Sequence, residues 1–383
     1  MTILKSWIFG VYTDEIQLTC HTEPRRSMTS KLITKGSNSE FTLRRAQSDS
    51  SLGSLLMIFL FLLLTSGFAQ DKVGTTAAQF LTISGGARPT AMGGAYVAVA
   101  EGPSAQFWNP AGIALSLQNE VEFSMADWFL DTKLVHTSVV IPIGRQVIGI
   151  NMKQLDYGDE MVTTIQDPEG TGEFWSAKER SLGVTYAAKL TDRFALGGNV
   201  KFINQDIYHV SAKGMALDIG LLYRSQFKNL RIGMSISNFG TDMQLSGEDL
   251  MQPVDIDPSN EGNNDNISAN LNTDQWPLPL TYCVGVAVDI MDTEMIRWTI
   301  ATDALHPNNN NSYLRVGTEI KIANILYLRT GHSAIGKNHA EESLSYGVGF
   351  RYTLGGMKFG YDYSYTPFGK LGNIPRNSIY IGL

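Results

Sequence analysis

The sequence predicts an all-β protein, a transmembrane β-barrel of about 14 antiparallel strands with an N-terminal plug segment inside its lumen. From Val121 onward, apolar residues recur at every second position, as in strands whose two faces meet different surroundings. An apolar run suited to export precedes these strands, and the connections between them alternate between short and long. Outer-membrane barrels combine these features, so we place the protein in the bacterial outer membrane, in contact with its lipid.

The apolar run Leu55–Leu64 indicates export. A spanning helix needs about 20 apolar residues, whereas a signal-peptide core needs about 7 to 15 followed by small residues at the cleavage site. Gly67 and Ala69 fit those small positions. We therefore expect residues 1–69 to be an N-terminal extension and signal peptide that is removed, and a mis-assigned start codon to explain its length.

The barrel itself is expected over residues 119–383. A soluble β-sandwich would show the same alternation with its apolar face inward, but the number of strands in series and their loop lengths favour a membrane barrel. The predicted strands lie near 119–128, 133–143, 146–156, 178–190, 193–208, 212–225, 229–239, 279–291, 294–304, 312–323, 325–335, 343–354, 357–367 and 376–383.

Short and long connections fall on opposite ends of the predicted barrel. The short turns lie at 144–145, 191–192, 226–228, 292–293, 324 and 355–356. If the N-terminus starts in the periplasm, these turns are periplasmic and the mostly longer loops lie outside, as in outer-membrane barrels. The strand at 376–383 can then pair with that at 119–128 and close the wall without a free edge.

The plug is expected over residues 70–118. Residues 74–115 are rich in Gly and Ala, have no sustained helical or strand period, and end in the turn Trp108–Gly112. A segment of small residues cannot build a core of its own, so it is best housed inside a larger structure with a polar interior.

The plug carries the pattern FLxIxxGARxxAMGGAYVAxAxxxxAxxWNPAG, which starts at Phe80 and ends at Gly112. The motif residues that we single out are Gly86, Ala87, Arg88, Ala91, Met92, Gly93, Gly94, Trp108, Asn109, Pro110 and Ala111. This pattern resembles the opening of the PorV/PorQ family, relatives of the FadL-type outer-membrane transporters. PorV proteins usually have a lysine and an aromatic residue where Gly112 and Ile113 follow Ala111 here, so the resemblance is to the wider family.

The resemblance implies two functions. PorV-like proteins bind exported cargo through its C-terminal signal domain and pass it between the type IX translocon and a surface-attachment complex. FadL-like barrels take up hydrophobic small molecules past a plug that rearranges. We favour the first, with translocon subunits and cargo signal domains as partners, and keep the uptake of a hydrophobic ligand as the alternative.

Two long loops, predicted at 157–177 and 240–278, carry apolar residues in polar surroundings. Such residues suit either a protein partner or an apolar ligand. The candidate partner-binding residues are Phe174, Trp175, Leu245, Leu250, Met251 and Trp276.

Charged residues on the polar face of the strands are expected to line the lumen. They are Glu122, Lys201, Asp218, Arg224, Arg231, Asp289, Arg297, Asp303, Arg315, Glu319, Lys321, Arg329, Arg351 and Asp362. An ion-selective pore would more naturally show a ring of one sign. Because both signs are mixed, we expect these groups to pair with each other and with the plug backbone.

Other chemistry is not indicated. No GxSxG, HExxH or CxxC motif accompanies the histidines, so we expect no catalytic residue, no enzyme activity and no cofactor. The acidic loop at 240–278 lacks the spaced Gly and terminal Glu of an EF-hand, so no metal site is expected. Loss of Cys20 with the leader leaves only Cys283, which excludes an internal disulfide. The net charge of −7 and the lack of a basic cluster argue against nucleic-acid binding.

Overall fold

The computed structural model describes residues 73–259, 266–337, 342 and 344–383. All of them belong to a compact unit, Ala69–Leu383. The expected signal peptide and its cleavage site after Ala69 lie outside the described residues. In the described part of the chain, no helix is long and apolar enough to cross a membrane.

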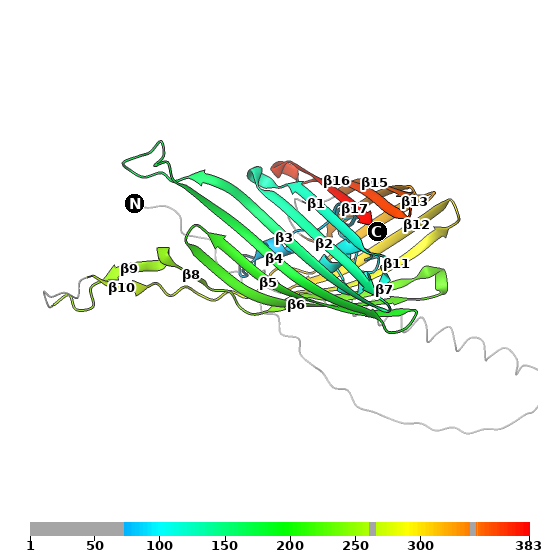
Figure 1. Cartoon of the computed structure of the whole chain (residues 1–383), viewed down its shortest axis with the longest axis horizontal. Helices are drawn as coiled ribbons and strands as arrows, with labels where there is room; N and C mark the ends of the chain where they lie inside the picture. The colour runs from blue at the N-terminus through cyan, green and yellow to red at the C-terminus, as the bar shows by residue number, and fades with distance from the viewer. Residues whose placement is uncertain (1–72, 260–265, 338–341, 343) are drawn as a thin grey trace, which may run out of the picture. The chain divides into compact units, whose positions relative to one another are not determined.

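Fourteen antiparallel strands form a closed barrel (Figure 1). They are β1 (Glu120–Asp127), β2 (Lys133–Ile143), β3 (Gln146–Met161), β4 (Phe174–Lys189), β5 (Phe194–Ile207), β6 (Val210–Arg224), β7 (Arg231–Gly240), β11 (Thr281–Asp292), β12 (Ile296–Pro307), β13 (Tyr313–Ile322), β14 (Leu326–Ile335), β15 (Leu344–Leu354), β16 (Met357–Pro367) and β17 (Asn373–Gly382). Each strand pairs with its neighbour in this order, and β1 pairs with β17 from Glu120↔Gly382 to Ala126↔Arg376. The predicted fold and its closing pair of strands are confirmed.

The short turns gather at one end of the barrel and most longer loops at the other, which we call the short-turn end and the long-loop end. Gly144 and Arg145 join β2 to β3, and Gly355 and Gly356 join β15 to β16, both at the short-turn end. The sorting is not complete, because only Tyr208 and His209 join β5 to β6 at the long-loop end, whereas residues 225–230 join β6 to β7 at the short-turn end.

The two predicted long loops contain more β-structure than expected. β3 continues to Met161 and β4 starts at Phe174, so only 162–173 separate them. The segment 240–278 holds β8 (Leu245–Gly247), which pairs with β6, and the hairpin of β9 (Met251–Val254) with β10 (Ile267–Asn270). The sequence did not reveal these parts because both faces of a strand meet water beyond the membrane, so the apolar alternation stops.

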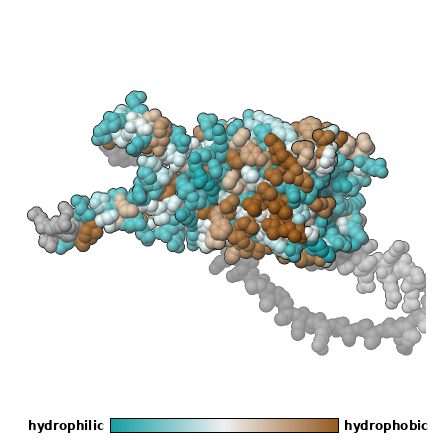
Figure 2. Space-filling model, in the orientation of Figure 1, coloured by the Kyte–Doolittle hydropathy of each residue, from teal (hydrophilic) through white to brown (hydrophobic). Residues whose placement is uncertain are grey.

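The outer face of the wall carries an apolar band. Figure 2 shows hydrophobic residues gathered across the wall, with hydrophilic residues toward its two ends. Phe350, Tyr361 and Ile379 are among the exposed apolar residues, whereas Ser345, Asp362 and Ser378 on the opposite face of the same strands are buried. The band therefore faces lipid, and the polar face lines the lumen.

Arginine on this band is expected to destabilise the barrel, whereas on the inner face it meets protein. Val348→Arg should cost about 2 to 4 kcal/mol near the membrane midplane. At Gly349 the limit is space, since a Cβ atom there would lie 2.2 Å from Asp362 Oδ1. The measurement is the free energy of folding into lipid bilayers as a function of denaturant. If Val348→Lys lost no more folding free energy than Val348→Ala, the assignment would be contradicted.

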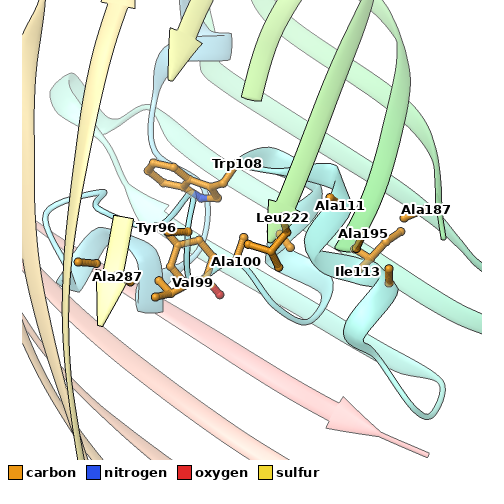
Figure 3. Close-up of a cluster of buried hydrophobic side chains, with 14 of the residues drawn as sticks. Tyr96, Val99, Ala100, Trp108, Ala111, Ile113, Ala187, Ala195, Leu222 and Ala287 are labelled. Atoms are coloured by element: carbon orange, nitrogen blue, oxygen red, sulfur yellow. The ribbon is translucent and has the colours of Figure 1, made fainter. Parts of the chain in front are cut away.

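The plug occupies the lumen as four short helical segments joined by irregular chain. They are η1 (Gln79–Thr82), α2 (Ala87–Ala91), η2 (Pro103–Phe107) and η3 (Pro110–Leu115). Figure 3 shows plug side chains such as Tyr96, Ala111 and Ile113 packed toward Ala195 and Leu222 of the wall. The main apolar core is therefore shared between the plug and the inner wall.

Candidate functional site

Glycines on the inner wall make room for the plug backbone. A Cβ atom on Gly331 would lie 2.1 Å from Met92 C, and one on Gly197 would lie 2.5 Å from Pro110 C. We call the inward glycines that meet plug atoms in this way the glycine belt, namely Gly149, Gly197, Gly220, Gly233, Gly317, Gly331 and Gly347. Since any larger residue at these positions would overlap the plug, the belt determines where the plug can lie.

Asn109 fixes the turn at the end of the plug motif. Its Nδ2 atom donates to Val97 O at 2.9 Å and to Leu221 O of β6 at 3.0 Å. Its Oδ1 atom accepts from Ala111 N at 3.2 Å, which caps η3, and Pro110 occupies the first helical position. One buried side chain thus joins two parts of the plug to the wall.

Trp108 packs within the plug. Its Nε1 atom donates to Gly85 O at 2.9 Å, and its ring meets the Tyr96 ring edge-on with centroids 6.0 Å apart. The guanidinium of Arg315 lies over the Trp108 ring at 5.4 Å from its centroid. Trp108 therefore links the first and last parts of the plug to a lumen cation.

Wall side chains of β12 and β17 bind the plug, mostly through its backbone. The carboxylate of Asp303 on β12 accepts from Tyr96 N at 2.8 Å and Val97 N at 2.9 Å. On β17, Ser378 Oγ accepts from Ala87 N at 2.8 Å, and Arg376 donates to Thr90 Oγ1 at 2.8 Å and to the carbonyl oxygen of Ser84. These contacts satisfy plug N–H and C=O groups that have no partner within a regular element.

Arg88 joins the plug to a chain of alternating charges on the wall. It binds Glu319 through Nε at 2.9 Å and Nη2 at 3.0 Å, and Glu101 through Nη1 at 2.8 Å. Burial alone would lower the pKa of Arg88. Glu319, Tyr96 and Glu101 together raise it by more than burial lowers it, so the pKa lies well above its ordinary value and the guanidinium stays charged.

The chain of charges continues along the wall. Arg329, whose side chain is 0% exposed, binds Glu319 at 2.6 Å and Asp362 at 2.7 Å. Arg351 binds the other oxygen of Asp362 at 2.5 Å. We call the whole series the charge ladder, which runs Glu101, Arg88, Glu319, Arg329, Asp362, Arg351. Three cations alternate with three anions, so the ladder carries no net charge.

The predicted pairing of lumen charges is confirmed for most of these groups. Besides the ladder, Lys201 binds Asp218 at 2.8 Å, and Arg231 binds Asp289. Glu122 accepts instead from Ser104 N of the plug at 3.2 Å.

The plug lies between two cavities. One, of about 420 Å³, opens among residues of the short-turn end such as Asn324 and Thr353, and Arg88 and Tyr96 of the plug line it. The other, of about 250 Å³, reaches Asn309 at the long-loop end and is lined by plug residues that include Trp108. Both cavities mix charged, amide or hydroxyl groups with apolar side chains, such as Leu115 in the first and Leu305 in the second, and plug residues contribute to the lining of each.

The candidate partner-binding residues lie near the long-loop end but at separate places. Phe174 and Trp175 stand at the start of β4, Leu245 lies on β8, Leu250 and Met251 lie where η6 (Glu248–Leu250) meets β9, and Trp276 forms a bridge with Met243. All are exposed except Leu250, which is half-buried. Figure 1 shows the β3–β4 hairpin and the β9–β10 hairpin projecting at different points, so these residues form two surfaces and not one pocket.

Residues 66–256, about half of the chain, match the family described as Type IX secretion system protein PorV. The chain belongs to the PorV family. The family match covers the plug and the strands up to β7, together with part of the loop that follows.

Solved outer-membrane barrels resemble this PorV-family chain in fold. The CymD monoaromatic hydrocarbon channel has 11% sequence identity and a TM-score of 0.51, with 77% of this chain and 96% of that chain covered. The toluene transporter TbuX of Ralstonia pickettii has 14% identity and a TM-score of 0.49, with 78% and 97% covered. No curated protein sequence matches. At these identities the first likeness shows the fold alone.

Some residues that hold the plug of this PorV-family barrel were not singled out from the sequence. Lys153 donates to Leu81 O at 2.9 Å and to Ile83 O, and Gln106 accepts from Thr185 Oγ1 at 2.8 Å. Arg376 was also missed. Lys153 has the inward parity of its strand, like Asn151, so the alternation could have found it, whereas Arg376 stood at the uncertain edge of a predicted strand.

Proposed function

We propose that this PorV-family outer-membrane barrel works as a docking protein of type IX secretion, with its plug keeping the lumen shut. The observation that carries the proposal is the attachment of the plug, which the charge ladder, Asp303, Asn109 and Arg376 bind to strands on different sides of the barrel. A protein that conducts freely has no use for so many buried links between plug and wall. The firm attachment of the plug therefore favours a function that is carried out by the exposed loops.

The loops supply apolar anchors for such binding. Phe174 is 59% exposed and Met251 is 52% exposed, and both lie among polar neighbours at the long-loop end. Protein interfaces are typically built from exposed aromatic and methionine side chains within a polar rim. We propose translocon subunits or the C-terminal signal domain of exported cargo as partners, and binding without catalysis as the mode of action.

Uptake of a hydrophobic small molecule is the second candidate. The fold is shared with hydrocarbon channels, which supports it. Against it stand the charged and hydroxyl-bearing groups that lie among the apolar side chains in the walls of both lumen cavities. Transport along this route would require the plug motif from Gly86 to Ala111 to leave the glycine belt.

Affinity purification of tagged variants from native envelopes tests the proposal. We expect the unaltered protein to recover translocon subunits or cargo with a C-terminal signal domain, and Phe174→Asp/Trp276→Asp to recover at least tenfold less, since loss of one aromatic anchor of about 2 kcal/mol already weakens binding about thirtyfold. Phe227→Asp, at an exposed aromatic residue of the short-turn end, is the control and should recover as much as the unaltered protein.

Two results would contradict docking. One is equal recovery by the double variant and the unaltered protein. The other is recovery of the protein alone with bound hydrocarbon, together with loss of growth on such compounds after deletion of the gene, which would establish transport instead. The heat-dependent gel mobility typical of folded barrels checks that each variant is folded.

A further inference from the structure

A groove of about 510 Å³ lies on the outer wall toward the long-loop ends of β4, β5 and β6. Its floor and sides include Leu182, Phe202 and Met215, which are outward-facing and about half exposed. The groove is separate from the lumen, the plug and the candidate loop residues. Its lining is apolar over most of its length, with polar side chains gathered toward one end.

The groove forms where β6 passes from one partner strand to another. β7 pairs with β6 only as far as Ala216, and β8 pairs with β6 only up to Ala212. Lys213–Met215 therefore lie between the segment of β6 that pairs with β7 and the segment that pairs with β8. Gly214 has no side chain, and Met243 packs against it. Thr241 holds Met215 in place through Thr241 N to Met215 O at 3.0 Å and Met215 N to Thr241 Oγ1 at 3.1 Å. The depression is thus part of the wall's hydrogen-bonded structure.

Two cations stand at the polar end of the groove. Arg180, Asn204 and Lys213 are register partners on β4, β5 and β6, and the next outward row toward the membrane is Leu182, Phe202 and Met215. Within the described residues, neither Arg180 nor Lys213 has an ion pair or a side-chain hydrogen bond.

The acidic groups nearby are already engaged. Asn204 donates to Asp206 at 2.5 Å, and in the row beyond Lys178 pairs with Asp156 at 3.4 Å. Arg180 and Lys213 are therefore available to bind an anionic group of a ligand.

The spacing of these cations suits a phosphate. Neighbouring strands lie about 4.8 Å apart, so the backbones of Arg180 and Lys213 are about 10 Å apart and both long side chains can reach a group over Asn204. Arginine binds phosphate oxygens through two N–H groups, and lysine supplies a point charge. The apolar row below them, Leu182, Phe202 and Met215, is exposed on the outer face of the wall.

We propose that the groove binds one phosphate-bearing membrane lipid, with its phosphate on Arg180 and Lys213 and an acyl chain along Leu182, Phe202 and Met215. The charge of the site complements the headgroup, and its apolar surface complements the chain. A soluble anion lacks the acyl chain, and an uncharged lipid lacks the phosphate. Neither therefore matches both the cations and the apolar surface of the groove. The proposal does not rest on the docking function and holds for either candidate function.

Native mass spectrometry of the full, delipidated protein with added phosphatidylglycerol tests the site. We expect one lipid to bind, and Arg180→Gln/Lys213→Gln to weaken it about thirtyfold, since each basic side chain near a headgroup contributes a factor of about five. Leu182→Trp, which fills the groove but keeps both cations, should also weaken binding. Diacylglycerol, which lacks the phosphate, should bind no better to the unaltered protein than to the double variant.

The matched control is Arg145→Gln/Lys228→Gln, which removes the same charge from exposed turns at the short-turn end. It should bind phosphatidylglycerol like the unaltered protein. The proposal is overturned if the control loses as much affinity as Arg180→Gln/Lys213→Gln, or if inorganic phosphate alone displaces the lipid. Equal binding by the unaltered protein and the Arg180→Gln/Lys213→Gln variant would overturn it as well.

Discussion

Gly197→Leu is expected to push the plug out of place and open the lumen, whereas Gly198→Leu on the same strand is expected to do neither. A Cβ atom on Gly197 would lie 2.5 Å from Pro110 C and 2.6 Å from Ala111 N, so a leucine cannot fit beside η3. Overpacking of this kind costs about 1 to 3 kcal/mol when the structure adapts. Here the least costly adaptation is movement of the plug, because β5 is held in the wall by its hydrogen-bonded pairing with β4 and β6.

Gly198 provides a closely matched control. Its side chain position faces outward, and an added Cβ atom would meet only Asp218 O at 3.7 Å, an ordinary contact. We expect swelling of liposomes in small solutes, or sensitivity of cells to bulky antibiotics, to rise for Gly197→Leu alone. Equal leakage by the two variants, or none by Gly197→Leu while its plug remains protected from labelling, would refute the role given to the glycine belt.

Loss of Arg329 is expected to be the most destabilising single change in the lumen. Its side chain is buried between Glu319 and Asp362, and removal of one partner from a buried ion pair costs about 3 to 5 kcal/mol because a charge is left uncompensated. For Arg329→Met we expect about 3 kcal/mol, the lower end of that range, since Arg88 and Arg351 still bind the two carboxylates. The free energy of unfolding in urea, measured in lipid vesicles, gives the number.

A second variant separates charge imbalance from lost packing. Arg329→Met/Glu319→Gln restores the neutrality of the charge ladder, so it should be more stable than Arg329→Met alone although it carries one more change. If the double variant is less stable by the sum of two independent losses, the charges of the ladder do not act as a unit. Arg145→Gln, in an exposed pair at 3.9 Å with Asp192, should leave the stability unchanged.

The wall of the barrel could be predicted because lipid and lumen impose a period of two on every spanning strand. That is why the turns at Gly144 and Gly355 and the pairing of β1 with β17 follow from the sequence. The same reasoning fails where strands leave the membrane, as at Met161, because water on both faces imposes no pattern. The small strands β8, β9 and β10 were not predicted for that reason.

The interior was predictable only in part. A mixed-charge lumen follows from strand parity, and the sequence indicated that the charges would pair. Which charges meet is set by the position of each strand around the barrel, as in the contact of Arg88 with Glu319 from a site 231 residues away. Likewise the loop residues Phe174 and Trp276 could be recognised as exposed, but their separation on two surfaces depends on the course of the loops.

Two of the groups that hold α2 stand at the seam of the barrel, and this affects how the protein can be assembled. Ser378 and Arg376 lie on β17, 291 and 286 residues from the plug residues Ala87 and Thr90 that they bind, and β17 is also the strand that joins β1. Contacts of such long range form slowly, since most of the chain must be arranged before they exist. A wall that closed first would leave the plug to thread in through one end. We therefore expect the plug to lie within the still-open sheet during biogenesis, and the pairing of β1 with β17 to close the barrel and fix the plug in one late step.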